Sequence, residues 1–146
     1  MIELQVETDV QRPAPQVYEF VITNYMKNHP RWDGRVVRSE LNGDGELAVG
    51  ATGVEVRKEM GRENTFNFRV TELTADHLTF EANGSGGVAF GAVWAVTPSG
   101  EGSRVTMTFH LGMGGVMLLF EPLMKGAVRK DMRKAGQRIK ELVEAP

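Results

Sequence analysis

The first residues of the chain alternate between apolar and polar side chains. Apolar residues and Thr8 occupy the even positions from Ile2 to Val10, and polar residues occupy the odd positions from Glu3 to Gln11. A period of two is typical of a β-strand with one buried and one solvated face. The pattern therefore predicts an opening strand over residues 2–11.

Two prolines follow this strand and end it. Pro15 suits the first turn of a helix, where its missing N–H costs nothing. The apolar residues Val17 to Ile22 then fit a short amphipathic helix. Residues 24–32 are mostly polar and contain Pro30, and they predict a second short helix or an ordered loop.

From Arg35 to Leu111 the period of two returns in runs separated by turn signals. The turns at 42–45, 61–64, 75–76, 83–87 and 98–102 are rich in Gly, Asn, Asp and Pro. This spacing predicts six strands in antiparallel hairpins. After residue 115, apolar residues recur every three or four positions, which predicts one long amphipathic helix over 122–144.

These elements limit how the apolar faces can be buried. Seven strands make a sheet about 30 Å wide, whereas one helix is about 10 Å across, so the helix cannot cover the sheet. We expect a curved seven-stranded antiparallel sheet around the C-terminal helix, with either large side chains or a ligand in the remaining space. The predicted class is α+β, in the order β-α-α-β6-α, as one domain over residues 1–146.

Composition and net charge exclude some kinds of partner and of catalytic or metal site. The 146 residues are 41% hydrophobic, contain no cysteine and carry a formal net charge of −2. This balance disfavours nucleic acid as a partner, and the lack of cysteine excludes thiolate metal sites and cysteine nucleophiles. No leader or membrane-spanning run is visible, so we expect a cytoplasmic protein without stable membrane insertion.

The order of elements and two local motifs carry a family resemblance. Residues 13–21 read PAPQVYEFV and residues 29–32 read HPRW. With the closing helix, they are similar to the START/Bet v 1-like superfamily, in particular its polyketide cyclase/dehydrase and lipid-transport type. The resemblance implies a helix-grip fold with an apolar cavity between the curved sheet and the C-terminal helix.

Large apolar residues occupy the strand positions that are predicted to face inward, or they lie where the long helix meets the strands. They predict a pocket for an apolar or aromatic small molecule, although an ordinary filled core has the same pattern. The predicted lining residues are Trp32, Phe66, Phe68, Phe80, Phe90, Trp94, Met107, Phe109, Met113, Met117, Phe120 and Met124.

Glycines lie along the edge of this predicted pocket. The segment from Gly112 to Gly115 is either a gate at its mouth or a plain joint between strand and helix. Gly126 and Gly136 interrupt the long helix, where close packing or space for a ligand would explain their cost.

Few polar groups are expected inside. Eight charged residues alternate with the apolar ones along their strands, so their side chains are predicted to face solvent. They are Glu55, Arg57, Glu59, Arg69, His77, Glu81, Arg104 and His110. Possible polar groups of the cavity are Tyr18, His29, Arg31 and His110, the last because a bulge near its strand end could turn it inward. The sequence assigns no catalytic role to any of them, and three scattered histidines give no metal site.

Three functions remain open at this stage. The leading hypothesis is a protein that binds or carries a small hydrophobic ligand, such as a lipid, isoprenoid or polycyclic polyketide, without metal or cofactor. The first alternative is an enzyme of the cyclase, aromatase or dehydratase type, which the resemblance allows. The second is a protein-interaction module on the same fold. Seven basic residues on the long helix are either its solvated face or a patch for a membrane surface or an anionic partner.

Overall fold

The computed structural model describes residues 2–59, 61–84, 88–112 and 119–146. Strand β1 (Ile2–Val10) is followed by helix α1 (Ala14–Tyr18), the π-helical turn η1 (Glu19–Thr23) and helix α2 (Tyr25–Trp32). Six strands follow: β2 (Val36–Leu41), β3 (Thr52–Glu59), β4 (Arg62–Leu73), β5 (His77–Asn83), β6 (Ala89–Ser99) and β7 (Gly102–Gly112). The last element is helix α3 (Glu121–Glu144).

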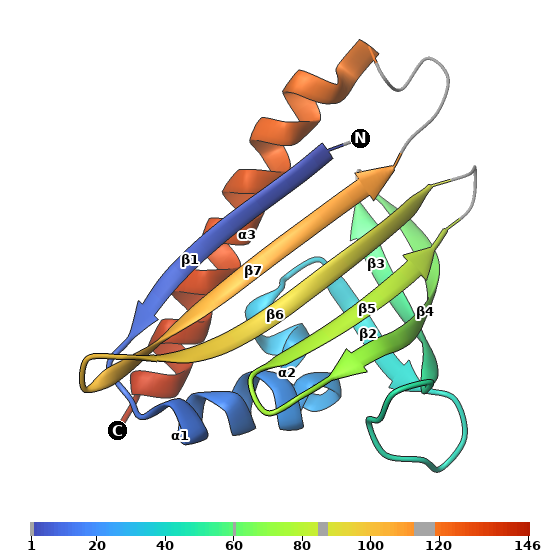
Figure 1. The fold of residues 1–146 in the computed structure, drawn as a ribbon. Coiled ribbons are helices and arrows are strands. Elements are labelled where there is room, and N and C mark those ends of the chain that lie inside the picture. Colours follow the sequence, from blue (N-terminus) through green and yellow to red (C-terminus); the bar gives the residue numbers. More distant parts are fainter. Residues whose placement is uncertain (1, 60, 85–87, 113–118) are drawn as a thin grey trace.

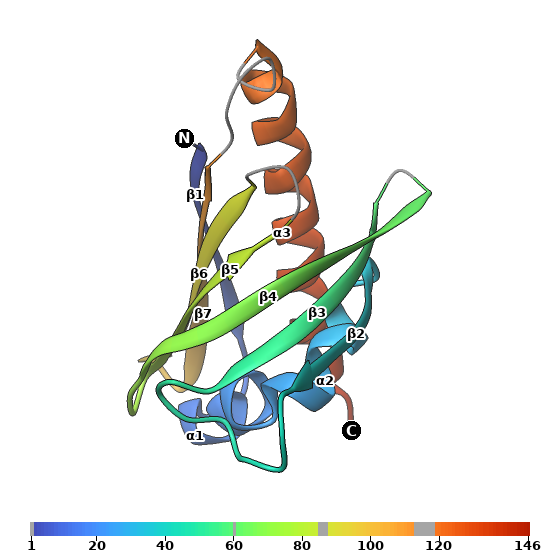
Figure 2. The ribbon, with the colours of Figure 1, turned by 90° about the vertical axis from the view of Figure 1, so that its right-hand side faces the viewer.

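The strands form one antiparallel sheet in the order β1-β7-β6-β5-β4-β3-β2. Figure 2 shows that β4, β3 and β2 turn away from the direction of β1 and β7, so the sheet curves around α3 and the short helices. The predicted helix-grip architecture and the order of its elements are therefore confirmed. Within the part of the chain that the structure describes, no helix is long and apolar enough to cross a membrane.

The buried residues of helix α3 lie in its C-terminal half. Ala135, Ile139 and Val143 are buried in the main core cluster. A Cβ atom at Gly136 would collide with the Thr8 side chain on β1, so this glycine permits a close approach of helix and strand. The start of the helix extends past the N-terminal end of β1, as Figures 1 and 2 show.

One prediction about the sheet is wrong. On β3, the inner face carries Gly53, Glu55 and Arg57 rather than the valines between them, because Glu55 pairs in register with the buried Phe66 of β4. Val56, on the opposite face, is also buried. Since β3 buries residues on both faces, apolar alternation does not report which face is the inner one.

The inner face of β3 leaves room for side chains of the neighbouring strand. A Cβ atom at Gly53 would meet the ring of Phe68, so the glycine admits this ring beside the β3 backbone. Further along β3, the carboxylate of Glu55 reaches the interior, where only 5% of the residue is exposed. The fold thus brings a charged strand face next to an aromatic core.

Candidate functional site

Most of the predicted lining residues lie in the interior. Trp32, Phe66, Phe68, Phe80, Trp94 and Met107 are buried, and Phe90 and Phe109 pack against the same cluster with partial exposure. Met124 packs against a smaller cluster of Ile2, Leu4 and Leu111. Phe120 lies apart from these residues, at the N-cap of α3, and is 53% exposed. Met113, Met117 and the segment 113–115 lie outside the described residues.

Aromatic rings nearly fill the interior. The ring centroid of Tyr25 lies 5.6 Å from that of Phe80 and 5.8 Å from that of Trp94. A cavity remains between Tyr25, Phe68, Phe80, Phe90, Ala82 and Glu55, and about 10 Å³ of it is open to the centre of a water molecule. This is space for about one water. The described structure is therefore closed, with a small apolar cavity next to a polar group.

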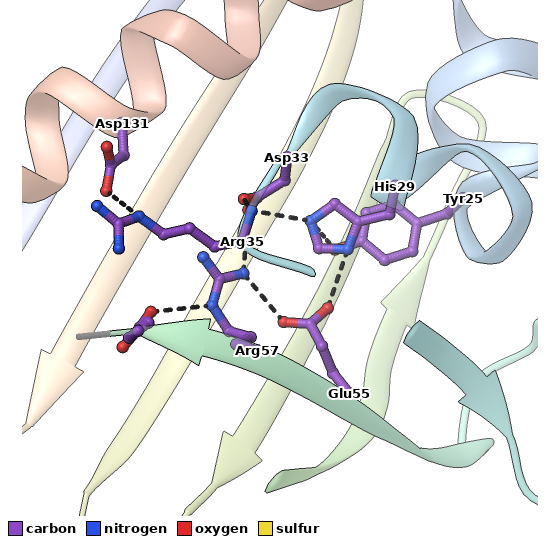
Figure 3. A network of polar contacts seen from close by, with 8 residues as sticks. Tyr25, His29, Asp33, Arg35, Glu55, Arg57 and Asp131 are labelled. Atoms are coloured by element: carbon purple, nitrogen blue, oxygen red, sulfur yellow. Dashed lines mark hydrogen bonds and ion pairs between the residues drawn. The ribbon is translucent and has the colours of Figure 1, made fainter. Parts of the chain in front are cut away.

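The polar group is centred on His29 of α2, shown in Figure 3. His29 is 4% exposed, and its Nδ1 lies 2.9 Å from Glu55 Oε1, close enough for an ion pair but without the geometry of a hydrogen bond. Its Nε2 lies 3.4 Å from the Tyr25 hydroxyl and 3.7 Å from Asp33 Oδ2. The four-residue spacing of Tyr25 and His29 stacks their rings, with centroids 4.6 Å apart.

Arg57 joins the carboxylates of this group. Its Nη1 donates to Asp33 Oδ2 at 3.0 Å and to Glu55 Oε2 at 3.3 Å, and its Nε donates to Glu59 Oε1 at 3.1 Å. Asp33 also accepts a hydrogen bond from the backbone N–H of Arg35. The site thus holds three carboxylates, one guanidinium and one imidazole, and both cationic side chains have carboxylate partners.

These contacts set the protonation states. Burial acts to lower the pKa of His29, but the charges of Glu55 and Asp33 outweigh it and raise the pKa above 6.5. Burial acts to raise the pKa of Asp33 and Glu55, but His29 and Arg57 outweigh it and lower both. Burial raises the pKa of Tyr25 well above 10, so its phenol stays protonated. The site can therefore hold a proton on His29 beside a neutral hydroxyl.

The other three predicted polar groups do not join this site. The Tyr18 hydroxyl donates to the carbonyl of Thr74 at 2.6 Å in an exposed position. Arg31 is exposed and lies over the ring of Phe20, 5.4 Å from its centroid. The side chain of His110 points outward from β7 and is 40% exposed. Its Nδ1 lies 3.8 Å from Glu3 Oε2. Of the four, only His29 lies beside the cavity residues.

The indole N–H groups of two tryptophans lie near the site. Trp32 Nε1 and Trp94 Nε1 are both buried; Trp32 Nε1 lacks a hydrogen-bond partner within the described residues, whereas Trp94 lies close enough to the Tyr25 hydroxyl to act as a donor that lowers the pKa of Tyr25. The ring centroids of the two tryptophans lie 5.6 Å apart, and each lies about as close to His29, at 5.6 Å and 6.0 Å. Buried donors without a partner are rare and costly in folded proteins, so an acceptor atom of a bound molecule would be favourable here.

Four members of this site were not predicted from the sequence: Tyr25, Asp33, Glu55 and Arg57. Two signals were available. Tyr25 and His29 share one side of a helix, and residues 55, 57 and 59 of β3 carry charges of alternating sign. Neither signal specifies burial, because the same spacing is common on solvated faces. Among the described residues, no group of three or more His, Asp or Glu has an arrangement that could hold a metal ion.

Comparison with known proteins identifies the family. The profile described as "Polyketide cyclase / dehydrase and lipid transport" matches residues 1–144. The chain belongs to this family. An uncharacterized family relative from Mycobacterium tuberculosis, Rv1546, is 26% identical over 150 residues, covering 99% of this chain and 98% of that protein.

Solved structures agree with this assignment at the level of the fold. A START superfamily protein from Mycobacterium smegmatis superposes with a TM-score of 0.77 at 11% identity, covering 97% of each chain. The crystal structure of Ara h 8.0201 superposes with a TM-score of 0.72 at 13% identity, again covering 97% of each chain. The likeness to START and Bet v 1 proteins predicted from the sequence is thereby confirmed.

Proposed function

We propose that this protein binds a small hydrophobic ligand between the curved sheet and its helices, with one polar group of the ligand beside Tyr25, His29 and Glu55. The observation that carries the proposal is the small cavity whose lining is aromatic except for Ala82 and Glu55. The buried and unpartnered indole N–H of Trp32 supports a ligand that carries a hydrogen-bond acceptor.

Binding requires the interior to enlarge. A space for about one water cannot hold a lipid or a polycyclic molecule. The aromatic rings around the cavity must therefore move when the ligand enters. We expect the apolar contacts with the ligand to offset the free-energy cost of this rearrangement. The ligand would then select a minor open state of the protein.

A neutral apolar dye such as Nile red tests the proposal. Trp32 and Trp94 are the two tryptophans of the chain and both are buried near the site, so their fluorescence reports on the same interior. Saturable dye uptake, with a parallel change in tryptophan emission, is expected. Absence of both would overturn the proposal.

Two matched variants locate the binding space. Ala82→Val fills the cavity, whereas Ala92→Val adds the same groups to a core position of β6 that does not line it. Because its added methyl groups occupy space that the dye needs, Ala82→Val should weaken dye binding about tenfold or more. Ala92→Val should affect stability but leave the dissociation constant within about threefold. Equal weakening by both variants would place the dye elsewhere.

A second function, an enzyme of the cyclase or dehydratase type, is favoured by one specific arrangement. Glu55, His29 and Tyr25 form a line of contacts in which a charged imidazole lies between a carboxylate and a phenol. In such a line the phenol, next to the charged imidazole, can donate to a ketone oxygen, while the ionised Glu55 carboxylate, which lines the cavity, accepts the proton from the adjacent carbon. This arrangement suits removal of a proton from the carbon next to a carbonyl.

Exchange of carbon-bound protons tests this second function without knowledge of the substrate. The probe is 2-tetralone in D2O, with loss of its α-proton signals followed by NMR. If the enzyme function holds, the wild type and His77→Gln exchange faster than buffer, while His29→Gln does not. Exchange at the buffer rate in the wild type would remove the enzyme candidate and leave the binding proposal intact.

A further inference from the structure

Large apolar side chains are exposed in the first turn of α3 and in the two residues that precede it. Leu119 is 79% exposed, Leu123 is 75% exposed, and Phe120 between them is 53% exposed. Both ribbon views place this end of the helix beyond the N-terminal end of β1 (Figures 1 and 2). Scattered single apolar residues on a surface need no explanation, but three within five positions at a projecting tip form a patch.

Cationic residues continue the same side of the helix. Leu123, Lys130 and Lys134 follow one another at spacings of seven and four, which puts them on one side of an α-helix. A shallow groove runs along this side, and its lining residues are Gly126, Arg129, Lys130, Arg133, Lys134 and Gln137. We call the surface formed by Leu119, Phe120, Leu123, Lys130, Arg133 and Lys134 the outer face of α3.

The cations of this face are not neutralised by the protein. Arg129, Lys130, Arg133 and Lys134 form no ion pair within the described part of the chain. By contrast, in the last turns of α3 Arg138 pairs with Glu141 and Lys140 pairs with Glu144. Asp131, the carboxylate nearest in sequence, pairs with Arg35 of the chain after α2. A local positive charge therefore remains on a protein with a net charge of −2.

We propose that the outer face of α3 docks on an anionic lipid bilayer. The apolar tip is suited to the boundary of head groups and acyl chains, and the cations behind it are suited to the negatively charged head groups. Charge complementarity selects this partner: an apolar tip alone would fit many surfaces, but an unneutralised basic stripe continuous with it fits a negatively charged one. The docked helix lies on the bilayer and does not cross it. This inference is independent of the proposed ligand binding.

Vesicle flotation tests the docking. The wild type should float with vesicles of equal parts phosphatidylcholine and phosphatidylglycerol, should not float with pure phosphatidylcholine, and should be released by salt. Leu119→Asp/Leu123→Asp should reduce the floated fraction about tenfold, whereas Val37→Asp/Val49→Asp, which changes two other exposed apolar residues, should not change it. All four positions are exposed, so circular dichroism should show intact folding.

Charge reversal provides the second pair of variants. Lys130→Glu/Arg133→Glu/Lys134→Glu should abolish flotation, and Lys27→Glu/Lys58→Glu/Arg62→Glu, with the same net charge and other exposed positions, should retain it. Equal loss in both triple variants would show a response to net charge alone and overturn the proposal. Absence of flotation in the wild type would do the same. If the wild type self-associates without lipid and Leu119→Asp/Leu123→Asp does not, the face is an interface between copies of the chain and the bilayer proposal is wrong.

Discussion

Glu55 Oε1 lies 2.9 Å from His29 Nδ1, and both side chains are at least 94% buried. The two residues belong to different layers, because His29 lies on α2 and Glu55 on the inner face of β3 (Figure 3). Burying two charges is costly unless they are paired. The contact therefore fixes how α2 closes one end of the sheet, and it also creates the polar end of the proposed binding site.

Glu55→Gln should lower the free energy of unfolding by about 3 kcal/mol, because it removes a negative charge that balances the positive charges of Arg57 and His29 in the interior. Glu59→Gln is the matched control. It removes a contact to the same arginine on the same strand, but Glu59 has a side chain 40% exposed, so the loss should stay below about 1 kcal/mol. Chemical denaturation measures both values. Equal losses would show that burial of Glu55 does not matter energetically.

The raised pKa of His29 predicts a stability that depends on pH. The folded pKa lies above the unfolded value of 6.5, so the contribution is complete below pH 6.5 and is lost as the pH rises through the folded pKa. The lowered pKa of Glu55 acts in the opposite direction. Its contribution is complete above the unfolded pKa of 4.5 and is lost as the pH falls through the folded pKa. Denaturation at a series of pH values should therefore show greatest stability between about pH 5 and 6.5.

His77 is the necessary control for the alkaline side. Hydrogen bonds to Glu72 and Asp76 also raise the pKa of His77, although this residue lies at the surface. His29→Gln should flatten the decline in stability above pH 6.5 more than His77→Gln does, because His29 is buried between two carboxylates. A decline that persists in His29→Gln and disappears in His77→Gln would assign the effect to the surface histidine.

The overall fold followed from the sequence because most of its signals are local. The alternation in β1, the glycine-rich turns and the three- and four-residue spacing in α3 each depend on neighbours along the chain. Gly61 and Gly100, both with positive φ, lie at the β3–β4 and β6–β7 turns where the sequence predicted them. The order of elements then left few ways to bury their apolar faces.

The site followed from the sequence only in part. His29 was a candidate, but Glu55 and Arg57 were assigned to solvent because charged residues on a strand usually are. What decides their burial is long-range: the register of β3 with β4, and the position of α2 over the end of the sheet. Tyr18 and Arg31 lie on short helices, and the sequence does not determine which side of such a helix meets the core. His110 keeps the outward orientation that its position on the strand predicted.

Asp131 and Arg35 make the ion pair that connects α3 to the segment after α2, at 2.9 Å with both side chains about two-fifths exposed. Asp131→Asn should lower the free energy of unfolding by less than about 1 kcal/mol, since solvent screens exposed pairs. Its coupling to Arg35→Ala in a double-mutant cycle should be of similar size. A coupling of about 2 kcal/mol or more would mean that the pair determines the position of α3 and is not an ordinary surface contact.

The two glycines of α3 should respond oppositely to the same substitution. Glycine costs a helix about 1 kcal/mol relative to alanine, so Gly126→Ala should stabilise the protein by up to that amount because no atom lies within 4 Å of the added Cβ. At Gly136 the added Cβ would collide with Thr8 and approach Met107, so α3 would have to move away from β1. Gly136→Ala should therefore destabilise the protein by about 1–3 kcal/mol despite its better helix propensity.

Thermal and chemical denaturation of the two single variants checks this difference in sign, and Thr8→Ala gives the control for its cause. In a Thr8→Ala background the colliding hydroxyl is absent, so Gly136→Ala should recover much of its loss while the effect of Gly126→Ala stays unchanged. If Gly136→Ala is stabilising by itself, the approach of α3 to β1 is not limited by this glycine.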